Sequence, residues 1–141
     1  MQGSYVALVT PFNEDGSVDF TAVDRLLEWH VSEGTEGVVL LGTTGESAAI
    51  HNEERSKFIV HCVSRIAGRI HVMVGTGSTS TDETIKRTLE AKSLGANSAL
   101  IVTPYYNKPN QTGLYEHYSK VAESCRFPIV MYNVPSRTSC D

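Results

Sequence analysis

Five short apolar runs, each rich in β-branched residues, recur along the chain about every 30 residues, the length of one βαβ repeat. Most of them are apolar throughout rather than alternating, which is typical of strands buried on both faces. We therefore expect strands at Tyr5–Val9, Val38–Leu41, His71–Val74, Ala99–Val102 and Ile129–Tyr132.

The segments between these runs carry apolar residues at helical spacing and predict four helices. The third is expected to begin at Ser80, because Glu83 three residues later fits a capping box. The fourth is expected over residues 112–124. The inward faces are Phe20, Val23, Leu26, Leu27 and Val31 on the first helix, Phe58, Ile59, Cys62, Val63 and Ile66 on the second, and Leu114, Tyr118, Val121 and Ala122 on the fourth.

Alternating strands and helices predict an α/β fold with parallel strands and right-handed crossovers. Two closures compete, an open doubly wound sheet and a (β/α)8 TIM barrel. The Rossmann fingerprint is missing, because "GTGSTS" has only two of its glycines and follows the third strand. The loops that leave strands, such as "GTTGES" and "TPYYNKPN", carry most of the reactive side chains. Barrel enzymes place their sites there, but doubly wound sheets bind ligands at the same edge, so both closures stay open.

Length and composition limit the possible functions. The 141 residues form a single expected domain, residues 1–141, about half of what a complete barrel needs. A net charge of -4 gives no basic surface for nucleic acid, and no apolar run is long enough to cross a membrane. The three cysteines are odd in number and widely spaced, which indicates reduced thiols in a cytoplasmic protein. The histidines lack metal-ligand spacing, so we expect no metal.

Three loops carry candidate chemistry. Thr43 and Thr44 in "GTTGES" combine hydroxyl groups with glycine-flanked backbone, which suits a carboxylate ligand, although an ordinary βα turn has the same composition. Tyr106 and Tyr132 each follow an apolar strand, where a phenol could relay protons or simply pack. Arg137 could hold a carboxylate with two hydrogen bonds or remain solvated.

Taken together, the loop motifs resemble those of a known enzyme family. "VTPF", "GTTGES", "GTGS", "TPYYNKP" and "YNVPSRT", in this order and spacing, resemble the dihydrodipicolinate synthase (4-hydroxy-tetrahydrodipicolinate synthase) family of pyruvate-dependent class I aldolases and lyases. The resemblance covers the whole chain but only the N-terminal half of a family member. It implies a TIM barrel of which this chain supplies about the first four and a half βα units.

The resemblance also implies a reaction in lysine and diaminopimelate biosynthesis. Pyruvate would form a Schiff base with a lysine and then, as an enamine, attack aspartate semialdehyde, with no cofactor. Thr44 would bind the pyruvate carboxylate, and Arg137 the carboxylate of the semialdehyde. Tyr132 would donate and accept protons through Thr43 and Tyr106. In the family that last tyrosine comes from a neighbouring subunit, which implies a homo-oligomer, typically a dimer of dimers.

By the same resemblance, the Schiff-base lysine lies on the sixth strand, beyond this chain. A neutral lysine amine needs a desolvated site, which helical and polar-loop lysines do not have. We therefore expect the 141-residue chain alone to be inactive. The lysines concerned are Lys57, Lys86, Lys92, Lys108 and Lys120, the helical ones being expected in solvent.

Many family members also bind lysine as an inhibitor. Four positions match that possible allosteric site, namely Ser47, Ala48, Glu83 and Tyr105. Asn52, Arg55 and Thr79 depart from the His, His and Asn of the lysine-sensitive pattern. The resemblance therefore implies weakened or absent feedback inhibition.

Two alternatives remain. One is a stable, non-catalytic half-barrel that binds or assembles through its exposed strands. The other is a different pyruvate lyase, such as N-acetylneuraminate lyase. Arg137 within "PSR" favours the synthase over a sugar-acid lyase.

Overall fold

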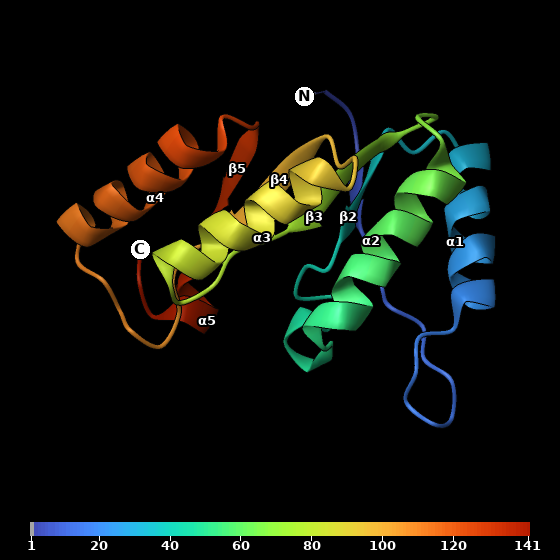
Figure 1. Ribbon diagram of the computed structural model, residues 1–141, viewed down its shortest axis with the longest axis horizontal. Helices are drawn as coiled ribbons and strands as arrows, with labels where there is room; N and C mark the ends of the chain where they lie inside the picture. Colours follow the sequence, from blue (N-terminus) through green and yellow to red (C-terminus); the bar gives the residue numbers. More distant parts are fainter. Residues whose placement is uncertain (1) are drawn as a thin grey trace.

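The computed structural model describes residues 2–141 and arranges them as a parallel sheet covered by helices (Figure 1). The strands are β1 (Tyr5–Ala7), β2 (Gly37–Leu40), β3 (His71–Gly75), β4 (Ser98–Val102) and β5 (Ile129–Tyr132). The helices are α1 (Phe20–Ser32), α2 (Asn52–Ile66), α3 (Thr81–Ser93), α4 (Gln111–Cys125) and α5 (Pro135–Thr138), with a 3-10 turn, η1 (Ser47–Ala49).

The strand order decides between the two closures that the sequence left open. The sheet runs β1-β2-β3-β4-β5 in chain order, and every neighbouring pair is parallel. Right-handed crossovers that always advance in one direction leave every helix on the same face, whereas a doubly wound sheet must reverse its order. Figure 1 shows α1 to α4 fanned across one side of the strands. This is singly wound geometry, the arrangement of a barrel.

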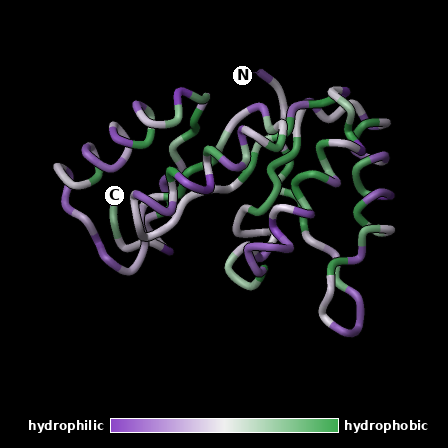
Figure 2. The backbone as a smooth tube through the Cα atoms, viewed as in Figure 1, coloured by the Kyte–Doolittle hydropathy of each residue, from purple (hydrophilic) through white to green (hydrophobic). Residues whose placement is uncertain are grey.

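The core lies between the sheet and these helices. Val38 and Val74 on the strands are fully buried and belong to the same cluster as Leu27 of α1 and Phe58 of α2. A smaller cluster joins β4 to α4 and contains Cys125. In Figure 2 the strands and the inner stripes of the helices are coloured as hydrophobic, while the outer stripes are hydrophilic. The apolar spacing seen in the sequence therefore identifies the packed faces.

Most predicted elements are confirmed within one or two residues, the margin within which element ends vary. The prediction for the first strand was too long, because regular pairing stops at Ala7, although the Leu8 amide still donates to the Val39 carbonyl. Cys62 is fully buried among the core residues, as its spacing indicated. No helix within residues 2–141 combines the length and apolar character needed to cross a bilayer.

The capping-box prediction at the start of α3 needs correction. Ser80 caps α3 by accepting from the Glu83 amide, but the Glu83 carboxylate accepts from Arg87 Nε at 2.9 Å, so only half of the capping box is formed. The prediction that Lys92 is solvated is confirmed, because the residue is exposed. Its Nζ also donates to the Cys125 carbonyl at 3.0 Å, at the last turn of α4.

Candidate active site

The "GTTGES" loop is tied to the carboxyl end of the sheet by the loop that follows β1. Thr10 Oγ1 donates to the Gly45 carbonyl at 2.8 Å, and both partners are buried. Gly45 lies so close to β1 that an added Cβ would be 3.0 Å from the Leu8 carbonyl oxygen. This anchoring leaves Thr43 and Thr44 exposed at the carboxyl edge, where a ligand can reach them.

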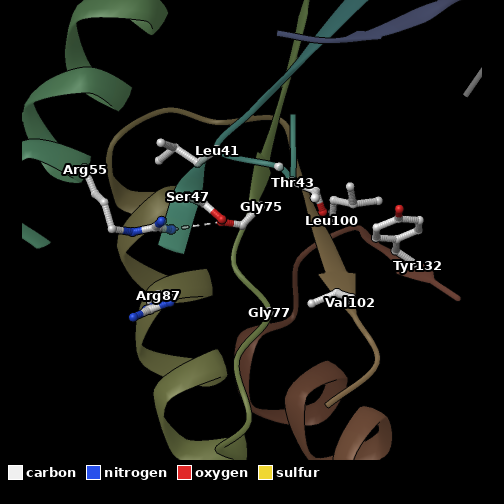
Figure 3. Close-up of a pocket in the computed structure, with 11 residues that line it drawn as sticks. Leu41, Thr43, Ser47, Arg55, Gly75, Gly77, Arg87, Leu100, Val102 and Tyr132 are labelled. Atoms are coloured by element: carbon white, nitrogen blue, oxygen red, sulfur yellow. Dashed lines mark hydrogen bonds between the residues drawn. The ribbon is translucent and has the colours of Figure 1, made fainter. Parts of the chain in front are cut away.

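Thr43 and Tyr132 line one cavity of about 50 Å³, although they come from the second and fifth strands of the sheet (Figure 3). The lining includes both glycines of the "GTGS" motif, Gly75 at the end of β3 and Gly77 two residues later. Because the carboxyl ends of parallel strands meet at one edge, residues far apart in sequence gather here. The predicted threonine and tyrosine are thus brought together.

The two glycines are required by close backbone packing. A Cβ on Gly75 would lie 2.1 Å from the Leu41 carbonyl oxygen, and one on Gly77 would lie 2.6 Å from the Val102 amide nitrogen. Neither distance is compatible with a side chain unless the backbone moves. The glycines therefore keep the neighbouring strand ends close enough to form the cavity.

A larger hollow of about 370 Å³ adjoins this cavity and is lined by both predicted groups of ligand-binding residues. Thr43 and Arg137 belong to the expected substrate set, whereas Ser47, Ala48 and Tyr105 belong to the expected lysine site. Arg137 is exposed on α5 at the rim. Within residues 2–141, some of the residues expected to bind substrate and some of those expected to bind lysine therefore line one hollow.

Three predicted residues lie outside these two hollows. Tyr106 is 89% exposed, with a left-handed backbone φ of 67°, and it projects from its loop. Thr44 is exposed beside Thr43 but lines neither hollow, and Glu83 lines a neighbouring hollow between α2 and α3. No hydrogen bond joins the hydroxyl groups of Thr43, Tyr106 and Tyr132 among the residues described. The proton relay through Tyr106 therefore stays a prediction.

Sequence reasoning did not place Arg55 and Arg87 in this site. Arg55 is only 4% exposed, lines the same cavity as Thr43 and donates from its guanidinium to the Gly75 carbonyl at 2.9 Å. Burial, followed by the like charge of Arg87, lowers the pKa of Arg55 to about 10. The signal was available, because Arg55 precedes Phe58 and Ile59 by three and four residues and so belongs to the buried stripe of α2.

Comparison with known proteins shows the family to which this chain belongs. The model of the dihydrodipicolinate synthetase family matches residues 1–141. The chain belongs to this family. It is 52% identical over 141 residues to a 4-hydroxy-tetrahydrodipicolinate synthase from Laribacter hongkongensis, and 52% identical to one from Polynucleobacter asymbioticus. All of this chain aligns, but it covers 48% of the first relative and 46% of the second.

Solved structures of the family confirm the fold. The dihydrodipicolinate synthase from Aquifex aeolicus superposes with a TM-score of 0.96 at 51% identity, and all of this chain covers 48% of that one. The chloride-inhibited enzyme from Acinetobacter baumannii, complexed with pyruvate, gives a TM-score of 0.98 at 48% identity over 99% of this chain and 48% of that one. The five-stranded sheet is therefore the N-terminal half of the family's barrel, as predicted, and the chain spans about half the length of its relatives.

Proposed function

We propose that this chain supplies the pyruvate-binding and proton-transfer residues of a 4-hydroxy-tetrahydrodipicolinate synthase, which condenses pyruvate with aspartate semialdehyde. The observation that carries the proposal is the meeting of Thr43 and Tyr132 at one cavity on the carboxyl edge of the sheet. Family membership supports it, as does a relative whose structure holds pyruvate. The lyase would belong to lysine and diaminopimelate biosynthesis in the cytoplasm.

The chemistry needs an amine that this chain does not provide. A lysine amine would attack the keto carbon of pyruvate, and loss of water would leave a Schiff base whose methyl group is acidic enough to give an enamine. All the lysines of the chain, Lys57, Lys86, Lys92, Lys108 and Lys120, are exposed. Since an exposed lysine amine is not desolvated, none of them suits this role. The nucleophile would therefore come from the second half of the barrel.

Each site residue of this chain would have a separate task. Thr44 would bind the pyruvate carboxylate through the exposed "GTTGES" loop. Tyr132 would transfer protons at the Schiff base through Thr43, which lines the same cavity. Arg137, across the larger hollow from Thr43, would hold the semialdehyde carboxylate with its planar guanidinium.

Tyr106 would complete the relay of a second subunit rather than of its own. Its phenol is almost fully exposed and lines neither hollow of this chain. A side chain placed in this way is available to a site on a second subunit. The proposed assembly is therefore a homo-oligomer, at least a dimer, in which two such tyrosines are exchanged.

A chimera tests the proposal directly. Residues 1–141 are joined to the remaining C-terminal part of the Laribacter hongkongensis relative, which aligns over the whole of this chain. Pyruvate with borohydride should add one pyruvate mass to the chimera and none to the 141-residue chain. Replacing Tyr132 by Phe should lower kcat by a factor of about 100 or more, the range for a lost proton-transfer group.

The matched control is Tyr115→Phe, because Tyr115 is 71% exposed on α4 and lines neither hollow of the candidate site. It should leave turnover unchanged. A pyruvate adduct on a lysine of the 141-residue chain would contradict the proposal. So would a Tyr132→Phe chimera with full turnover.

One feature favours a second function, a half-barrel that assembles without catalysis. Neither β1 nor β5 has a partner on its outer edge within residues 2–141, and Met131 of β5 is 66% exposed beside a hollow of about 640 Å³. Open edges and apolar hollows of this size promote association. Sedimentation of the 141-residue chain tests this: a well-folded species of defined size supports the second function, and aggregation argues against it.

A further inference from the structure

Arg55 is a buried cation without an anionic partner. Only 4% of the residue is exposed, yet no carboxylate lies within 4.0 Å of its guanidinium among the residues described. Its one hydrogen bond is to a neutral group, the Gly75 carbonyl. A guanidinium has five N–H donors, and a buried charge is costly unless it is paired. The remaining donors of Arg55 therefore have capacity for an anion.

A second guanidinium adds to the positive potential. Arg87 of α3 lines the same cavity as Arg55 (Figure 3). The like charge of Arg87 affects Arg55 more strongly than the carboxylates of Glu90 and Glu83, which act in the opposite direction. Glu83 is already engaged, because it accepts from Arg87 Nε at 2.9 Å. Among the charged groups around Arg55, Arg87 therefore has the largest single effect.

The cavity itself has room for a small ligand. Its volume of about 50 Å³ is several times the roughly 10–15 Å³ that a cavity needs to hold one water molecule. Figure 3 shows Arg55 directed toward Gly75, with Ser47 beside them and Thr43 and Tyr132 on the far side. Ser47 supplies a hydroxyl donor at the same wall.

We propose that the cavity end formed by Arg55, Arg87 and Ser47 is a binding site for a small oxyanion, either a phosphate or a carboxylate. Planar guanidinium groups bind both through paired hydrogen bonds. The same charges disfavour an amine ligand such as lysine, because an ammonium group would add a third positive charge. The site goes beyond the proposed function and does not depend on it. Where the chain does bind substrate, an anion here would occupy the cavity that Thr43 and Tyr132 share.

The test is binding, measured without pyruvate. The 141-residue chain and, in parallel, the chimera are titrated with sodium phosphate or sodium acetate at constant ionic strength. The readout is the midpoint of thermal unfolding, which rises when a ligand binds the folded state. We expect phosphate, acetate or both to raise the midpoint. A response to one anion alone identifies tetrahedral or planar recognition, and either response supports the site.

Variants separate this site from general salt effects. Arg55→Gln should weaken the apparent affinity by a factor of about ten or more, the loss expected for a charged hydrogen bond. Arg87→Gln should weaken it less, because Arg87 already pairs with Glu83. Lys57→Gln removes the same charge from an exposed position on the same helix and should change nothing.

Several results would overturn the proposal. One is that neither anion shifts the unfolding midpoint of the parent chain. Another is that the anions shift the midpoint equally in the parent and in every variant, Arg55→Gln included. A shift by L-lysine that exceeds those by the anions would do the same. If Arg55→Gln does not fold, Arg55→Lys and Arg87→Gln decide the question. An anion effect that both of these leave unchanged refutes the site.

Discussion

Thr10 and Gly45 are 35 residues apart in sequence, yet the hydroxyl of one donates to the carbonyl of the other inside the protein. This bond joins the "VTPF" and "GTTGES" loops and fixes where Thr43 emerges. It explains why a threonine follows the first strand, a position to which sequence reasoning gave no role beyond the family resemblance. The loop on the second strand is thus positioned by the first.

Replacing Thr10 by Val should destabilise the protein. The change keeps the shape of the side chain but leaves the buried Gly45 carbonyl without its donor, which costs about 1–3 kcal/mol. Urea unfolding measures the loss. Thr21→Val, at an exposed position of α1, is the matched control and should stay within about 0.5 kcal/mol of the parent. Equal stabilities for the two variants would show that the bond contributes nothing.

Gly75→Ala should disturb the cavity as well as the fold. The new methyl group would meet the Leu41 carbonyl oxygen at 2.1 Å, so the ends of β2 and β3 must separate. Overpacking of this kind costs about 1–3 kcal/mol. Gly42→Ala offers a control nearby, since its added Cβ would meet only Val39 Cγ1, at 3.7 Å. Chemical denaturation of both variants measures the difference, and similar free energies of unfolding would contradict the packing argument.

Arg137→Ala should separate the two proposed substrates. In the chimera it should raise KM for aspartate semialdehyde by about 10- to 100-fold, the equivalent of a lost charged hydrogen bond. Formation of the pyruvate adduct should be unchanged, because that step needs no contact with Arg137. Arg25→Ala, at an exposed position on α1, serves as the control. Unaltered use of the semialdehyde by Arg137→Ala would contradict the role proposed for Arg137.

The buried His117 should make the folded state less stable in mild acid. It is 5% exposed, its Nδ1 is 2.9 Å from Thr81 Oγ1, and burial lowers its pKa. Between the lowered folded pKa and the unfolded value of about 6.5, the unfolded chain binds more protons, so stability rises with pH. The contribution is complete above the unfolded pKa and is lost as pH falls through the folded pKa.

The measurement compares unfolding midpoints of the parent and His117→Gln from about pH 8 down to about pH 5, a range that spans the ordinary pKa of histidine. The parent should lose more stability in acid than the variant does. His51→Gln replaces an exposed histidine and should follow the parent. Parallel pH profiles for the parent and His117→Gln would exclude this linkage.

Local patterns predicted the elements, but not every contact between them. Apolar runs located the strands because buried parallel strands have no polar face. The choice of barrel over doubly wound sheet could not come from those runs, because it depends on strand order. Arg55 was read as a departure from a lysine site, and its burial escaped notice because charged residues usually face solvent. Its helical register contained that information.

The site was predictable in its residues more than in its geometry. Thr43 and Tyr132 line one cavity because β2 and β5 end at the same edge of the sheet. The loop motifs after these strands predicted that arrangement. The outward direction of Tyr106 depends on a left-handed backbone angle that no local pattern specifies. The pairing of Glu83 with Arg87, in place of its expected capping bond, reflects a competition between two local partners. Sequence spacing alone does not rank them.

The loop that carries Tyr106 is held in place by a hydrogen bond to a neighbouring loop. Asn107 Nδ2 donates to the Thr79 carbonyl at 3.0 Å, which joins the loop after β4 to the loop after β3. A side chain on a loop that is already held in place loses less conformational entropy on binding a partner than one on a free loop does. In the proposed oligomer, Asn107→Ala would remove this hydrogen bond and so weaken the contact of Tyr106 with the second subunit. The strength of that proposed contact would therefore depend partly on Asn107.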